Sequence, residues 1–261
     1  MRKIFMFWFA ASLLVAACEK EPDDNPGGDD GNDTLPHPEI IYRAVADIDG
    51  NCYDAVKIGD QVWMSENLRT TRYANGDPIP MGVESSTDPC RYAPDGDESQ
   101  VPVYGYLYNW SAVMHGETSS NAVPSGVQGI CPNGWHVPSD SEWTAMENFI
   151  TDANLPDYIV GRGDHAGKLA GGELGTWVQC RNFGAPGYYY SDYTERNSTG
   201  FSALPAGYFL DSIIKFHERA YFWSSSILGQ HPVYRRLEYN KTYVGRNSFY
   251  NAGLSVRCLR D

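Results

Sequence analysis

The chain has 261 residues and a formal net charge of −13, because 33 acidic side chains outnumber 20 basic ones. A surface this acidic repels nucleic acids and anionic membranes, so nucleic-acid binding is not expected. The part from Glu39 to Asp261 is long enough to bury a proper core as a single domain.

Residues 1–17 predict a lipoprotein signal peptide. Arg2 and Lys3 precede an apolar run from Ile4 to Ala17, which is shorter than the roughly 20 residues that span a bilayer. Cys18 follows small residues at the cleavage point, so we expect it to carry lipid and to become the mature N-terminus. The alternative is an ordinary secretion signal with a chance cysteine.

Residues 18–38 predict a disordered tether. The segment is acidic, contains several glycines and prolines, and has almost nothing apolar to bury. Acidic residues directly after the lipidated cysteine resemble the surface-export signal of Bacteroidetes lipoproteins. We therefore expect an outer-membrane protein, held by its lipid alone, that faces the cell exterior rather than the periplasm.

A hairpin is predicted next, with strands from Asn51 to Ile58 and from Gln61 to Met64 around the turn residues Gly59-Asp60. Residues 73–105 are rich in turn signals and predict irregular structure. Apolar residues at i, i+4 and i+7 then predict a helix from about Gly105 to Met114.

The clearest local signal is a second helix, from about Asp140 to Thr151. Ser139 and Glu142 have the spacing of a capping box, in which each side chain accepts a hydrogen bond from a free backbone N–H. Beyond them, Trp143, Met146 and Ile150 make one apolar stripe.

Short strands are predicted for the rest of the chain, which is rich in glycine and tyrosine after residue 163. Residues 220–226 and 233–239 predict two of them. From Leu254 to Cys258 apolar and polar residues alternate, which predicts a half-buried strand that directs Arg257 away from the core toward an acidic partner. Two helices followed by many short strands indicate an α+β domain.

The cysteines indicate disulfides in an exported protein. Besides Cys18 they are Cys52, Cys90, Cys131, Cys180 and Cys258. Their spacing fits neither a zinc knuckle nor a C-x-x-C redox motif. Five cysteines allow fifteen arrangements of two bridges and one free thiol, and the spacing does not choose among them.

Several motifs in order resemble the Fibrobacter succinogenes major paralogous domain family, which is common on Bacteroidetes lipoproteins. They are Asp47–Asn51, Val56–Leu68, Tyr104–Trp110, Cys131–Trp143, Gly200–Tyr208, Phe222–Ser226 and Gly253–Cys258. The resemblance covers about Ala46 to Asp261. It implies a C-type-lectin-like fold, also similar to sulfatase-modifying factors, with two helices packed on a curled, mostly antiparallel sheet with long loops.

The same resemblance implies a disulfide between Cys131 and Cys258. A pairing of Cys90 with Cys180 or with Cys52 is a further hypothesis. The family resemblance also argues against enzymatic activity. The formylglycine-generating relatives use two reactive cysteines near the C-terminal end, where this chain has only Cys258. No Gly-x-Ser-x-Gly and no His-Glu-x-x-His motif occurs, so we expect no enzyme.

No cofactor or metal ion is expected. Asp47, Asp49 and Asn51 imitate the start of a calcium loop, but Ile58 stands where the loop needs a bidentate acid. A weak second candidate for metal binding is the loop cluster of Asp95, Asp97 and Glu98. The carboxylate and amide triplets by which C-type lectins bind sugars through calcium are missing from the sequence.

What remains is a recognition surface on residues 182–197. This segment holds Tyr188, Tyr189, Tyr190 and Tyr193, and tyrosine offers rigid contact area with a polar tip. The alternative is that these rings pack the segment onto its own domain.

We expect a non-catalytic, lipid-anchored surface domain for adhesion or binding of a glycan or protein. A structural subunit of a pilus or fibre and a lectin-fold enzyme are the alternatives.

Overall fold

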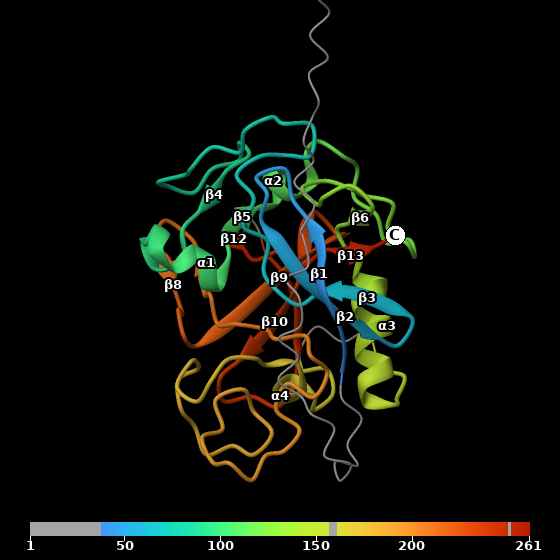
Figure 1. The fold of residues 1–261 in the computed structure, drawn as a ribbon, viewed down its shortest axis with the longest axis vertical. Coiled ribbons are helices and arrows are strands. Elements are labelled where there is room, and N and C mark those ends of the chain that lie inside the picture. The colour runs from blue at the N-terminus through green and yellow to red at the C-terminus, as the bar shows by residue number, and fades with distance from the viewer. Residues whose placement is uncertain (1–37, 157–160, 250–251) are drawn as a thin grey trace, which may run out of the picture.

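This computed structural model describes residues 38–156, 161–249 and 252–261. The predicted signal peptide, the lipid site at Cys18 and tether residues 18–37 lie outside the described residues. Mostly antiparallel sheets and a few short helices make up the described chain (Figure 1). None of its helices has the length and apolar character needed to cross a bilayer.

Three sheets form the framework. The first has the strand order β1 (Glu39–Ala46), β2 (Cys52–Ile58), β3 (Gln61–Met64), β13 (Leu259–Arg260) and β6 (Trp135–His136). The second consists of β11 (Gly245–Ser248), β10 (His231–Glu238) and β9 (Arg219–Leu228). The third runs β4 (Arg91–Tyr92), β5 (Leu107–Asn109), β12 (Gly253–Leu254), β7 (Tyr208–Phe209) and β8 (Ile213–Ile214). The first sheet thus brings strands from both ends of the described chain together.

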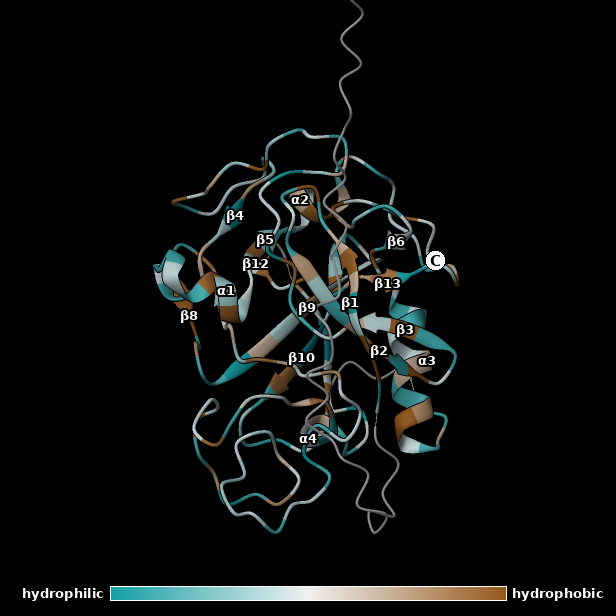
Figure 2. Cartoon of the chain, viewed as in Figure 1, coloured by the Kyte–Doolittle hydropathy of each residue, from teal (hydrophilic) through white to brown (hydrophobic). Residues whose placement is uncertain are grey.

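The helices are α1 (Val101–Tyr104), α2 (Trp110–Met114), α3 (Asp140–Thr151) and α4 (Ala166–Leu169), with two 3₁₀ turns, η1 (Pro94–Gly96) and η2 (Glu98–Gln100). The predicted second helix is confirmed as α3, and both hydrogen bonds of the Ser139–Glu142 capping box are present. Figure 2 shows hydrophobic residues recurring between hydrophilic ones along α3, as expected for an amphipathic helix.

The predicted helix from Gly105 to Met114 is wrong in its first half. Gly105 has a φ of 71°, which ends α1 rather than beginning a helix. Leu107–Asn109 instead form β5, which pairs with β4 on one side and β12 on the other. The helix begins only at Trp110, where the Asn109 side chain accepts a hydrogen bond from the Ala112 N–H at 3.0 Å.

The hairpin of β2 and β3 and the later strands β9 and β10 are confirmed. The prediction of a half-buried last strand is wrong, because every residue from Gly253 to Leu259 is buried. The Arg257 side chain is therefore buried and not directed toward solvent. Its guanidinium donates instead to Asn67 Oδ1 at 2.7 Å and to the Met64 carbonyl at 3.0 Å, and it lies 4.7 Å from the Phe201 ring centre. Burial lowers the pKa of Arg257 to about 9.

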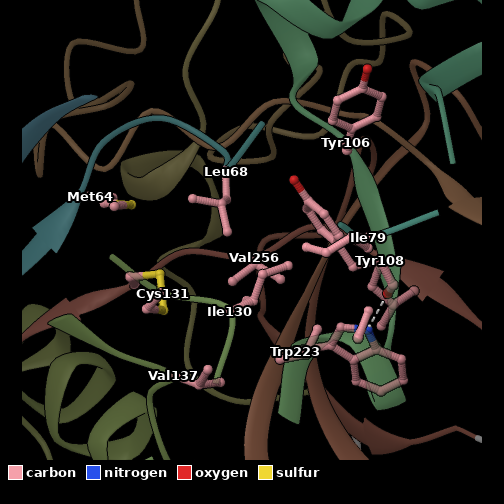
Figure 3. Packing of buried hydrophobic residues seen from close by; sticks show 14 of the residues in the cluster. Met64, Leu68, Ile79, Tyr106, Tyr108, Ile130, Cys131, Val137, Trp223 and Val256 are labelled. Atoms are coloured by element: carbon pink, nitrogen blue, oxygen red, sulfur yellow. Dashed lines mark hydrogen bonds between the residues drawn. A yellow bond between two sulfur atoms is a disulfide. The ribbon is translucent and has the colours of Figure 1, made fainter. Parts of the chain in front are cut away.

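The main core lies where the sheets meet, around Trp223, Tyr108 and Val256 (Figure 3). The Trp223 indole N–H donates to the Tyr108 carbonyl at 2.8 Å. Within this core, Cys131 and Cys258 form the disulfide that the family resemblance implies, with Cα atoms 5.9 Å apart. Cys90 and Cys180 are free thiols, so the guess that pairs Cys90 with Cys180 or with Cys52 is wrong.

Candidate functional site

Residues 182–197 form a loop beside α4, and hydrogen bonds to its neighbours fix its path. The Gly187 N–H donates to the Tyr239 carbonyl at 2.7 Å, just beyond β10. A Cβ atom at Gly187 would lie 2.1 Å from the Val178 carbonyl oxygen, so only glycine allows this approach. Within the loop, Arg196 donates to the carbonyls of Pro186 and Tyr188. The loop is therefore a built surface of the domain.

Two of the four predicted tyrosines point inward. Tyr188 and Tyr193 are buried, and the Tyr188 hydroxyl donates to Asp192 Oδ1 at 2.9 Å. Tyr193 packs against Gly167 of α4, where a Cβ atom would come within 2.7 Å of its ring. Burial raises the pKa of Tyr193 to about 12. For these two residues the alternative interpretation, packing onto the chain's own domain, holds.

The other two tyrosines form an outward pair. Tyr190 is 48% exposed and Tyr189 is half-buried. Their rings stack with centres 4.1 Å apart, and the Tyr189 hydroxyl donates to that of Tyr190 at 2.7 Å. Phe183, which is 57% exposed, lies edge-on to Tyr188 with ring centres 5.3 Å apart, and the Tyr188 ring centre in turn lies 5.5 Å from that of Tyr190. We call Phe183, Tyr189 and Tyr190 the aromatic patch.

The same loop forms one wall of an open groove of about 540 Å³. Its other walls are the beginning of β1, the β2–β3 turn and the end of α3. Phe149, 63% exposed, offers a ring surface here, and ion pairs join Lys57 to Glu39 at 3.9 Å and Lys168 to Glu195 at 2.9 Å. Sequence reasoning missed this groove, although Phe149 lies off the apolar stripe of α3 and is a hydrophobic residue without a place in the core.

Several acidic side chains that were weak candidates for metal binding accept local hydrogen bonds instead. Asp47 accepts from the backbone N–H groups of Asp49 and Asn51 at 2.9 and 3.0 Å, which closes a turn. Asp97 caps η2 by accepting from the Ser99 N–H and hydroxyl, and Glu98 accepts from the Tyr106 hydroxyl at 2.7 Å. Across the described ranges, no group of three or more histidine, cysteine or acidic side chains is arranged to hold a metal ion.

The buried side chain of His136 has an acidic partner at each ring nitrogen. His136 contacts Asp261 Oδ1 through Nδ1 at 2.7 Å and Glu142 Oε1 through Nε2 at 3.0 Å. Burial opposes its charge, but the hydrogen bonds and charges of these two acids outweigh burial and raise the pKa of His136 above its ordinary value. Both ring nitrogens are engaged by carboxylates, and this arrangement favours the charged form of the imidazole.

A second buried cluster joins α3 to the β10–β11 hairpin. Arg235 donates to Asp140 at 2.5 Å and to Glu147 at 2.6 Å, while Arg246 also binds Asp140 and Arg162 also binds Glu147. Burial alone would favour the neutral acid, but Arg246 and Arg235 hold the pKa of Asp140 below its ordinary value. This buried cluster fixes the helix on the sheet.

Comparison with known proteins identifies the chain through its family. The Fibrobacter succinogenes major domain matches residues 56–260, which is nearly all of the described chain. No curated protein and no solved structure matches the chain. The matched region includes α3, the disulfide and the loop that bears the aromatic patch. The chain therefore belongs to the Fibrobacter succinogenes major domain family.

Proposed function

We propose that this protein is a non-catalytic, lipid-anchored binding domain at the outer face of the outer membrane, and that it recognises a glycan. The observation that carries the proposal is the stacked Tyr189–Tyr190 pair, presented at the surface beside Phe183. Flat aromatic faces bind the apolar faces of sugar rings, and tyrosine hydroxyls add hydrogen bonds.

The groove beside the loop supports the same chemistry. Sugars present hydroxyl groups around a weakly apolar face, and the groove offers the Phe149 ring together with Thr194, Ser198 and paired charges. Because Lys57 and Lys168 are each paired with an acid, the groove has no unbalanced charge that would select a charged ligand. A neutral polyhydroxylated ligand suits such a surface.

The fold we propose is a variant of the C-type-lectin-like arrangement. In support, β1 and β13 share one sheet, so strands near the two ends of the domain lie together. The disulfide links the segment before α3 to the segment before β13. A rigid scaffold of this kind leaves its loops available for binding.

The test is a glycan array probed with the exported chain and with Tyr189→Ala/Tyr190→Ala. Tyr188 is spared because it is buried. We expect the double variant to bind at least about tenfold more weakly, which corresponds to about 1.4 kcal/mol. Tyr42→Ala is the matched control, since Tyr42 is 68% exposed on β1, outside the aromatic patch.

Three results would contradict the proposal: no glycan bound, equal binding by the double variant, or equal loss in the control. Stoichiometric co-purification with surface proteins would favour a structural subunit of a pilus or fibre. Substrate turnover would favour a lectin-fold enzyme. The anchor is tested separately by mass spectrometry of the mature N-terminus for acylated Cys18 and by protease accessibility on intact cells.

A further inference from the structure

A cavity of about 540 Å³ opens in the third sheet and shares no lining residue with the aromatic patch. Its walls come from β4 with the loop before it, from η1 and η2, and from the β7–β8 hairpin. Figure 1 places β4 and β8 on the same side of the molecule, next to α1. The cavity takes no part in the proposed glycan site.

The floor of this cavity is preformed. The rings of Tyr92 and Phe209 stack with centres 3.7 Å apart. Gly253 of β12 allows this arrangement, because a Cβ atom there would come within 2.6 Å of the Tyr92 ring. Ser85 and Asp211 join the two flanking loops through a pair of hydrogen bonds of 3.0 and 3.3 Å. A rigid, aromatic floor is typical of ligand pockets.

The wall of the cavity carries negative charge without a balancing base. Asp95 and Glu98 line it, and none of its described lining residues is lysine or arginine. Glu98 is fixed in place, because its Oε2 accepts from the Tyr106 hydroxyl at 2.7 Å. The nearest base in sequence, Arg91, is engaged with the Ile79 carbonyl and lies 5.0 Å from the Tyr106 ring centre.

The mouth of the cavity is apolar. Val83 is 87% exposed and Met81 is 38% exposed, and Ile213 lines the opposite side. Exposed hydrophobic residues around a cavity indicate a surface that a partner covers. The cavity thus combines a hydrophobic entrance with an anionic wall.

We propose that this cavity receives a lysine or arginine side chain from a partner protein. Such a side chain has an apolar stem and a cationic head. The stem would lie against Met81, Val83 and Ile213, and the head would meet Asp95 and Glu98. The charge of the wall selects a cation, and the hydrophobic entrance selects an organic one over a metal ion. Asp97, the third acid of the cluster, is already bonded to Ser99.

The experiment uses the exported full chain with ¹³C-methyl methionine, and follows the Met81 methyl resonance by NMR. The resonance is assigned with Met81→Leu. The probe is Nα-acetyl-lysine N-methylamide, compared with the norleucine analogue, which has the same stem without the charge. We expect the lysine probe to shift the Met81 signal saturably, with at least tenfold higher affinity than the norleucine probe.

Asp95→Asn/Glu98→Gln should lower affinity for the lysine probe at least tenfold. Asp60→Asn/Asp152→Asn is the matched control: it removes the same charge from two exposed acids outside the cavity and should bind normally. As a second variant, Ser212→Arg places a cation at the cavity from an exposed loop position and should block the probe.

Equal binding of the two probes would overturn the proposal, since the cavity would then be merely apolar. Equal loss in both charge variants would overturn it too, because the effect would be that of net charge alone. Calcium chloride that shifts Met81 and displaces the lysine probe would make the cavity a metal site instead. Each of these results leaves the glycan proposal untouched, because the aromatic patch lies elsewhere.

Discussion

At the scale of single residues, two buried histidines have pKa values shifted in opposite directions. His136 lies between Glu142 and Asp261, and its pKa is raised. His165 is fully buried, and neither of its ring nitrogens has a partner among the described residues. Burial lowers the pKa of His165 to about 4. Folding therefore favours the charged form of the first and the neutral form of the second, with opposite consequences for pH dependence.

His136→Gln should destabilise the protein most in mild acid. A folded-state pKa above the unfolded value stabilises the protein fully below the unfolded pKa, about 6.5, and the effect is lost as pH rises through the folded pKa. We expect the variant to lose about 1–2 kcal/mol of unfolding free energy at pH 6 and less at pH 9. Urea unfolding of the wild type and the variant between pH 6 and pH 9 measures this loss. A difference in unfolding free energy that does not change with pH would contradict the raised pKa of His136.

His165→Phe should act in the opposite direction. In the wild type, protonation of the unfolded state between pH 6.5 and pH 4 costs stability, by up to about 1.4 kcal/mol per pH unit. Phenylalanine has a similar volume and does not titrate. The variant should keep its stability at pH 7 and decline less steeply in acid, with His231→Phe, at an exposed position, as control. An unchanged acid slope would refute the prediction.

At the scale of elements, α3 is held by polar rather than purely apolar contacts. Its capping box fixes where the helix begins, and its buried acids Asp140 and Glu147 bind arginines of β10 and β11. A buried ion pair adds little net stability when complete, but the loss of one partner leaves a buried charge uncompensated. The cluster therefore determines how α3 docks on the sheet.

Arg235→Met should cost about 1.5–3 kcal/mol, because Asp140 and Glu147 each lose a buried charged hydrogen-bond donor, although Arg246 and Arg162 still pair with them. Arg236→Met, at the next position of β10, is the control. Its nearest acid, Glu238, lies 3.6 Å away at a partly exposed position, so we expect a loss below about 1 kcal/mol. Guanidinium unfolding of both variants gives the comparison. Similar losses would show that the cluster is not the stabilising feature.

At the scale of the whole molecule, the disulfide between Cys131 and Cys258 closes most of the domain. The two residues are 127 positions apart, so the bond restricts a long loop in the unfolded chain. It also joins the segment that precedes α3 to the buried final segment, which contains Arg257. The exported location that we propose would keep this bond oxidised.

Removal of the disulfide by Cys131→Ala/Cys258→Ala should lower the unfolding free energy by about 4–5 kcal/mol in the chain-entropy model. Cys180→Ala removes a free, partly exposed thiol and should change stability by less than about 0.5 kcal/mol. Thermal unfolding with and without reductant completes the test. A wild type that is indifferent to reductant would contradict this role of the bond.

Sequence alone determined those features whose signals are local. The turn at Gly59-Asp60 predicted the first hairpin, the spacing of Ser139 and Glu142 predicted where α3 begins, and ordered motifs predicted the family. The turn and the capping box depend on residues a few positions apart, whose backbone geometry and hydrogen bonds act within one element, and the family prediction depends on the order of such short motifs along the chain.

Only the tertiary structure decided the rest. Residues 107–109 are a strand because β4 and β12 flank them, and Arg257 is buried because the groups that bind it come from distant segments. In the same way, the loop's contacts with α4 and β10 turn Tyr193 inward and leave Tyr190 exposed. Hydrogen bonding and burial between remote segments override local periodicity, and no pattern in a single stretch of sequence contains them.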